Sequence, residues 1–311
     1  MRRRSGRALC LVGLLLLGSC GLSRSSEQAA PTDSGGSYGS GIDLEGLDGG
    51  GGSTGAGEKQ SSSGEPRGGG DGGGSASAPG AVAPGQTGGA RLIPRDRGAV
   101  GNNALVYLRP SFPKLAVEIN AANGREPSAA ALDRLRERLT SVVDKPAGIE
   151  FLPVNTFSVT RTEYSLDDVK AVEGLARKEW STDDRVVIHL LYLNGRPSYG
   201  NALGTAYGAS SIVVFPDRLE NAVTPVVGRA VLERAVLVHE VGHLLGLINI
   251  GYKSPRDHED PEHPTHSRNQ DSVMFWAAET DAVSTVLPGG PTDDFDADDR
   301  ADLADRAAGK L

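Results

Sequence analysis

Glycine is distributed very unevenly along this chain, and that unevenness limits what it can fold into. Residues 21–90 contain 23 of the 42 glycines, and much of the rest of that segment is serine, proline and alanine. The segment has no Gly-X-Y period, so a collagen triple helix is excluded. Because it carries too few apolar side chains to offset the entropy lost on ordering, we expect it to be disordered. The rest of the 311-residue chain suits one domain.

The first twenty residues have the layout of a secretory signal. A basic segment precedes an apolar run of about 11 residues, which is too short to span a membrane as a helix. The run ends Leu-Gly-Ser-Cys, which resembles the bacterial lipobox, whose cysteine becomes the lipidated first residue of the mature protein. We therefore expect a signal peptide over 1–19, a lipidated Cys20 with a Gly/Ser-rich linker over 20–95, and a folded domain over 96–311. An ordinary secretory signal with an incidental cysteine is the alternative.

From these features we expect the protein in a bacterial cell envelope, attached to a membrane through Cys20, with its domain facing the periplasm or the exterior. Cys10 would leave with the signal, so the folded domain would have no thiol, disulfide or cysteine metal ligand. The formal net charge of −8 disfavours a general nucleic-acid-binding protein. We expect a monomer without a nucleic-acid partner.

Apolar patterning beyond residue 100 predicts alternating strands and helices. Short apolar runs predict strands over 105–108, 115–119, 148–152, 185–193, 206–207 and 211–215, with 206–207 at an edge. Apolar residues at spacings of three and four, together with capping residues, predict helices over 128–143, 165–180, 227–245 and 297–308. We expect an α+β fold in which a twisted mixed β-sheet packs against helices, with an irregular subdomain after Gly246.

The pentapeptide His-Glu-Val-Gly-His occupies residues 239–243, at the end of the longest helical pattern. Side chains four residues apart share one face of a helix, so His239 and His243 can reach the same metal ion. Glu240 lies beside them and can act on a metal-activated water. This is the H-E-x-x-H arrangement of zinc hydrolases. A chance match within a buried helix is the alternative.

Two neighbouring features resemble the metzincin clan of metallopeptidases, whose H-E-x-x-H-x-x-G motif is followed by a turn that holds a methionine beneath the metal. Gly246 stands three residues after His243, and Ser-Val-Met ends at Met274. The resemblance implies a zincin-like fold, one catalytic Zn²⁺ and Met274 as the Met-turn residue. It is specific over 239–246 and 266–274, and elsewhere it concerns only the order of strands and helices.

The third metal ligand is where this chain departs from the clan, because Asn249 stands at the expected position and an amide oxygen is a weaker zinc ligand than an imidazole. In the archaemetzincin branch the third histidine opens a pattern resembling H-C-x-N-x-x-C-V-M. Residues 266–274 read His-Ser-Arg-Asn-Gln-Asp-Ser-Val-Met, so the resemblance favours His266 as the ligand, with His263, His258 and Asn249 as alternatives. Serines replace both cysteines, which implies that the family's second, structural zinc site is absent.

Other polar residues receive plainer interpretations. His189 lies in a predicted buried strand and is interpreted as a core histidine. The acidic run over 294–299 lacks the glycine and glutamate of an EF-hand loop, so we interpret it as acidic residues at a helix N-terminus. In some metzincins a tyrosine two residues after the Met-turn methionine helps to stabilise the oxyanion of the reaction. Trp276 stands at that place in this chain, and Tyr252 is the other candidate for such a role.

The sequence therefore predicts a membrane-anchored zinc metalloendopeptidase, a hydrolase that cleaves peptide bonds in a peptide or protein substrate. His239, His243 and His266 would bind the zinc ion, and Glu240 would be the general base toward the metal-activated water. An extended substrate could add to the sheet along the edge strand near 206–208. The alternative is a non-catalytic surface lipoprotein that binds a metal or a partner on a degenerate metzincin scaffold.

Overall fold

The computed structural model describes residues 92–311. The predicted signal peptide, Cys20 and nearly all of the predicted linker lie outside the described residues. Within 92–311, no helix is both long and apolar enough to cross a membrane.

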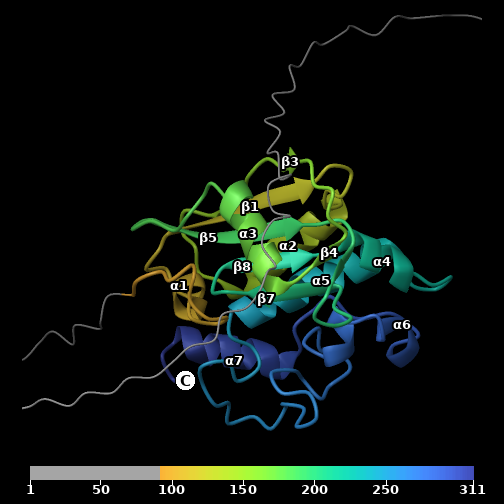
Figure 1. The fold of residues 1–311 in the computed structure, drawn as a ribbon. Coiled ribbons are helices and arrows are strands. Elements are labelled where there is room, and N and C mark those ends of the chain that lie inside the picture. The colour runs from red at the N-terminus through yellow and green to blue at the C-terminus, as the bar shows by residue number, and fades with distance from the viewer. Residues whose placement is uncertain (1–91) are drawn as a thin grey trace, which may run out of the picture. The chain divides into compact units, whose positions relative to one another are not determined.

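A six-stranded mixed sheet forms the centre of this region (Figure 1). Its strands run in the order β2-β1-β5-β8-β7, with β3 also paired to β1. All neighbours are parallel except β7, which pairs antiparallel with β8 and forms an edge. The bounds are β1 Lys114–Ala122, β2 Ile149–Phe151, β3 Asn155–Phe157, β5 Arg185–Tyr192, β7 Gly204–Tyr207 and β8 Ser211–Val214. The predicted mixed sheet and its edge strand are thus confirmed, and most of the sheet is parallel.

Alternate residues of the central strands face two different helical layers. On β5, Ile188 and Leu190 belong to the core shared with α2 (Ala129–Val142) and α5 (Arg229–Leu244). Leu191, the next residue along the strand, points to the opposite face and belongs to the core shared with α3 (Leu166–Ala176). Burial on both faces explains why β5 reads as an unbroken apolar run in the sequence.

Local capping signals set the starts of three helices, two of which were predicted as such. Ser128 accepts a hydrogen bond from the backbone N–H of Ala131 at the start of α2. Ser165 and Asp168 form a capping box at the start of α3. Asp296 and its partner Asp299 do the same for α7 (Ala297–Ala307), so the interpretation of the acidic run as a helix N-terminus is confirmed.

Three predictions along the chain differ from the structure. The predicted strand over 105–108 is a short helix, α1 (Ala104–Leu108), whose Tyr107 is buried with its hydroxyl 3.1 Å and 3.2 Å from the carbonyl oxygens of Val187 and Ala209, either of which can accept its hydrogen. A four-residue apolar run does not distinguish a strand from a buried helical turn. The helix α3 ends at Ala176 rather than at 180, and α4 (Pro216–Ala222) and the small sheet of β4 (Glu163–Tyr164) with β6 (Arg196–Pro197) were not predicted.

The segment between α5 and α7 is irregular, as predicted. It contains only a 3-10 helix, η2 (Trp276–Glu279), a single helical turn, α6 (Val283–Val286), and isolated β-bridges among the described residues. In Figure 1 this segment and α7 lie below the sheet, in blue. Gly246 ends α5 with a φ of 89°, and a side chain there would collide with Arg306 of α7. The end of α5 therefore packs closely against Arg306 of α7, which donates to the carbonyl of Leu245.

Candidate metal centre

The helix α5 carries the first part of the candidate site in a rigid, buried setting. His239 and Glu240 are fully buried, and His243 is 7% exposed. Apolar side chains on the same helix, such as Val236 and Leu237, pack into the core beneath the sheet. Packing on nearly all sides fixes the rotation of the helix, so both histidines point toward the irregular segment that follows it.

His266, from that irregular segment, meets the two histidines of α5. The ring centroids of His239 and His243 lie 4.7 Å apart, and the His266 ring lies 5.2 Å and 5.1 Å from them. The Nε2 atoms of His239 and His243 are 3.0 Å apart. Together with Glu279, the three histidines place one donor atom each within 4.8 Å of one another. This is the spacing of side chains that share one metal ion.

Each of the three imidazoles is oriented by a backbone carbonyl at its Nδ1 atom. The acceptors are the carbonyl oxygens of Val273 for His239 at 2.6 Å, of Leu247 for His243 at 3.1 Å and of Pro264 for His266 at 3.1 Å. A carbonyl only accepts, so these partners assign the proton of each neutral ring to Nδ1. Burial, helped by the neighbouring His239, lowers the pKa of His243 to about 3, so that ring is neutral. With the protons at Nδ1, the Nε2 lone pairs of His239 and His243 face each other and that of His266 faces Glu279, an arrangement that a bound cation would satisfy.

Glu240 is held by the edge strand of the sheet. Its Oε2 accepts a hydrogen bond of 2.6 Å from the backbone N–H of Ala206 on β7, whereas its buried Oε1 has no hydrogen-bond partner. Burial raises the pKa of Glu240 well above its usual range, and the negative charge of Glu279 adds to this effect. One oxygen thus fixes the carboxylate, and the other is available to a reacting water.

Glu279 is a potential ligand that the sequence reasoning missed. Its Oε1 lies 3.0 Å from Nε2 of His266, and its Oε2 lies 3.5 Å from Nε2 of His239. Burial alone would raise the pKa of Glu279, but hydrogen bonds and positive charge from His239 and His266, when their Nε2 atoms are protonated, hold that pKa well below the usual range. A bound cation would take over this role from the protons. The residue ends η2, and the only signal in the sequence is an acidic residue five positions after Met274.

Met274 packs directly beneath the histidine pair. It is fully buried, and a Cβ built on Gly242 would lie 2.2 Å from its Sδ atom. The carbonyl of Val273, the preceding residue, orients His239, and the carbonyl of Met274 accepts from the N–H of Ser267 at 2.8 Å. The turn therefore connects Met274 to both histidine-bearing segments.

The structure does not bring the three alternative third ligands into this cluster. Asn249 accepts from the N–H of Ser254 and donates to Glu259, and it adopts a φ of 59°. His263 bonds to Asp260 at 2.8 Å and stacks on Trp276 with ring centroids 4.3 Å apart. His258 bonds to Asp302 on α7.

The residues considered for oxyanion assistance are also engaged elsewhere. The Tyr252 hydroxyl donates to Asp302 at 2.7 Å. The indole of Trp276 stacks on His263, at the edge of the site. His189 is fully buried, with Nε2 3.1 Å from the Asn120 side chain, and it belongs to no metal-ligand cluster of the described residues.

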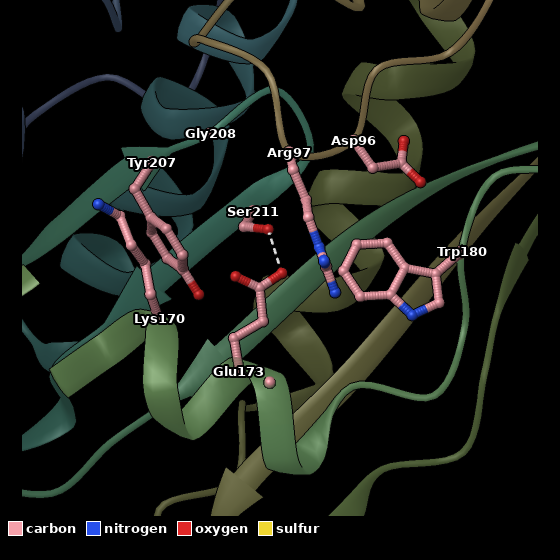
Figure 2. Close-up of a pocket in the computed structure, with 9 residues that line it drawn as sticks. Asp96, Arg97, Lys170, Glu173, Trp180, Tyr207, Gly208 and Ser211 are labelled. Atoms are coloured by element: carbon pink, nitrogen blue, oxygen red, sulfur yellow. Dashed lines mark hydrogen bonds between the residues drawn. The ribbon is translucent and has the colours of Figure 1, made fainter. Parts of the chain in front are cut away.

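A separate pocket of about 210 Å³ lies on the α3 side of the sheet (Figure 2). Glu173 at its floor accepts hydrogen bonds from Ser211 at 2.6 Å and from Arg177 at 2.7 Å. Arg97 lies over the Trp180 ring at its rim, 4.6 Å from the ring centroid. The pocket is lined by none of the chain's six histidines. It is therefore distinct from the candidate metal centre.

In comparisons with known proteins, the likeness of this chain is confined to solved structures. No protein-family model matches it, and no curated protein matches it. Among solved structures, the crystal structure of archaemetzincin (amzA) from Methanopyrus kandleri aligns with a TM-score of 0.41 and 19% sequence identity, over 65% of this chain and 98% of that one. Such a likeness leaves the chemistry of this chain to be argued from its own side chains.

Proposed function

We propose that this protein is a zinc-dependent metalloendopeptidase, in which His239, His243 and His266 bind one Zn²⁺ ion and Glu240 is the general base. The observation that carries the proposal is the cluster of three imidazoles with donor atoms within 4.8 Å of one another, each with a carbonyl at Nδ1, beside a carboxylate with one unpartnered buried oxygen. Three neutral imidazoles are a donor set that zinc accepts, and they leave a coordination position for water or substrate. Zinc is therefore the implied cofactor.

Zn²⁺, when bound, supplies a Lewis acid that lowers the pKa of water and polarises a carbonyl. The free Oε1 of Glu240 accepts the proton of the attacking water, and the N–H of Ala206 keeps the carboxylate in place for that transfer. Glu240 then returns the proton to the amine that leaves. The carbonyls at the three Nδ1 atoms keep the imidazoles in the tautomer that binds metal.

The substrate is proposed to lie along β7. This strand is the edge of the sheet, and it packs so closely on α5 that a Cβ on Gly204 would lie 2.6 Å from Val236 and 3.3 Å from Cγ of Glu240. An extended peptide that adds to this edge would pass over the general base. Peptides or proteins with an unfolded segment are thus the substrate class.

Cleavage of a peptide library by the zinc-loaded full-length protein tests this function. We expect cleavage by the wild type and none by Glu240→Gln, which keeps the volume of the side chain and leaves all three imidazoles in place. A wild type that binds zinc but cleaves nothing would refute the peptidase assignment and favour a metal- or partner-binding protein.

The third ligand has a matched pair of variants. His266→Ala is expected to lose one equivalent of zinc and all cleavage, whereas His263→Ala, in the same segment, is expected to keep both. The reverse result would show that His263 is the ligand.

We also propose that lipidation of Cys20 attaches the protein to a membrane of the bacterial envelope. The support is the Leu-Gly-Ser-Cys sequence after a short apolar run. Cys20→Ala should shift the protein from the membrane fraction to the soluble fraction, and an unchanged distribution would contradict the anchor.

A further inference from the structure

A second cluster of potential metal ligands lies where the irregular segment meets the start of α7. It consists of His258 and of Asp296 and Asp299, the two members of the α7 capping box. One donor atom from each residue lies within 4.8 Å of the others. None of these residues belongs to the three-imidazole centre, and the proposed function does not use them.

His258 presents an unpartnered ring nitrogen to this cluster. The side chain is 3% exposed, and Nε2 lies 3.1 Å from Oδ2 of Asp302. Because a carboxylate accepts, this partner assigns the proton of the neutral ring to Nε2. Nδ1 then carries the lone pair, and it is buried without a hydrogen-bond partner. It lies 3.7 Å from Oδ1 of Asp299.

Asp299 faces His258 with an unpartnered oxygen of its own. The residue is fully buried, and its Oδ2 accepts from the Ser272 hydroxyl at 2.6 Å and from the N–H of Asp296 at 3.1 Å. Its Oδ1 is buried and has no hydrogen-bond partner. Two buried acceptor atoms thus face each other without a bridging group.

The charge around Asp299 is not balanced by any nearby arginine or lysine of the described residues. Arg256, which belongs to the same network, pairs with Asp302 and Asp305 instead. The one ion-pair partner of Asp299 in the described part of the chain is His258, and this histidine carries a positive charge only when both ring nitrogens are protonated. A buried carboxylate without a compensating charge is costly, so the site favours a cation.

We propose that His258 Nδ1, Asp299 Oδ1 and a carboxylate oxygen of Asp296 bind a second divalent cation, for which Zn²⁺ is the test ion. One imidazole with two carboxylates is a donor set of zinc-class cations. Two ligands about 2.0–2.2 Å from a shared tetrahedral ion lie roughly 3.4 Å apart, close to the 3.7 Å gap between His258 and Asp299. Asp296 is half-buried, so water has access to the remaining coordination positions.

This cation would connect the segment that leads to His266 with α7 and, through Ser272, with the turn that carries Met274. Its donors are nitrogen and oxygen atoms of residues that the archaemetzincin pattern does not include, and no thiolate takes part. The loss of two cysteines implies that the family's second, structural zinc site is absent, and the geometry of these side chains argues for a different second site in the same region. The site would stabilise the fold rather than take part in hydrolysis.

Counting bound zinc separates the two sites. The full-length protein is stripped of metal and brought to equilibrium by dialysis against buffered free Zn²⁺. We expect two equivalents for the wild type, one for His258→Ala, one for Asp299→Asn and one for the double variant His239→Ala/His243→Ala. His263→Ala, a half-exposed histidine of the same segment, is the matched control and should keep two. Asp299→Asn covers the case in which His258→Ala does not fold.

One equivalent in the wild type, or two in both His258→Ala and Asp299→Asn, would overturn the second site and leave the peptidase proposal standing. Conversely, two equivalents without cleavage would refute the peptidase and leave this site standing. Nitrogen NMR of the histidine rings in the zinc-loaded wild type gives a test without substitutions. Metal coordination at His258 Nδ1 supports the site, whereas a doubly protonated His258 ring shows that a proton occupies the gap and refutes it.

Discussion

Gly242, in the middle of the His-Glu-Val-Gly-His sequence, is predicted to be intolerant of even a methyl group. An added Cβ would lie 2.2 Å from Sδ of Met274 and 3.2 Å from the ring of Phe295. The first distance falls short of ordinary van der Waals contact by about 1.2 Å. Met274 is fully buried, so the sulfur has no open space into which it can move freely.

The magnitude follows from a comparison with a second helical glycine. Gly174 lies on the exposed side of α3, and a Cβ there would meet nothing within 4 Å. Replacement by alanine should stabilise that helix by about 0.5–1 kcal/mol. Gly242→Ala receives the same gain in helix propensity but also overpacks the core, at a cost of about 1–3 kcal/mol. The difference between the two variants therefore isolates the overpacking.

Urea unfolding of the metal-free full-length protein measures both variants without a contribution from bound zinc. Gly242→Ala should unfold at lower urea than Gly174→Ala, and the zinc-loaded form should lose activity because Met274 is displaced from beneath the histidines. Adding Met274→Ala should relieve the clash, so Gly242→Ala should cost less in that background. Equal stability of the two single variants would refute the close packing of Met274 on α5.

Three further outcomes are expected. Gly246→Ala should lower the free energy of unfolding by about 2–5 kcal/mol, because the residue has a φ of 89° and its Cβ would lie 1.7 Å from Arg306. Gly251→Ala, where a Cβ would meet nothing within 4 Å, should lose only the backbone contribution of about 1–2 kcal/mol. Urea unfolding measures both. Glu279→Gln should weaken zinc binding about tenfold in a chelator competition, since its carboxylate contacts two of the imidazoles, and unchanged affinity would exclude it from the metal environment. Free zinc at a hundred times the Kd should raise the unfolding free energy by about 2.7 kcal/mol per site, and a smaller rise in His239→Ala/His243→Ala would confirm that these two residues bind it.

Elements with strong local signals could be predicted from the sequence. The unbroken apolar run of β5 and the capping box at Ser165 and Asp168 depend on neighbouring residues alone, and the structure contains both. The same holds for α5, whose apolar residues on nearly all sides indicate a buried helix. Two proposed ligands of the candidate site could be predicted in the same way, because the helix itself places His239 and His243 on one face.

Features that depend on contacts distant in sequence could not be derived in this way. The run at 105–108 lies in a helix whose Tyr107 hydroxyl contacts carbonyls 80 and 102 residues away. Glu279 reaches the imidazoles because the carbonyl of that residue accepts from the N–H of Leu203, which holds η2 against the start of β7. Nothing in the local pattern around 276–279 signals this contact.

The identity of the third ligand is the most direct test of the metal centre on which the proposed function depends. An anomalous difference map from zinc-soaked crystals of the protein locates the ion relative to every imidazole. We predict a peak about 2.0–2.1 Å from the Nε2 atoms of His239, His243 and His266. A peak bound to His239 and His243 but not to His266, or no peak between those two histidines, would contradict the account.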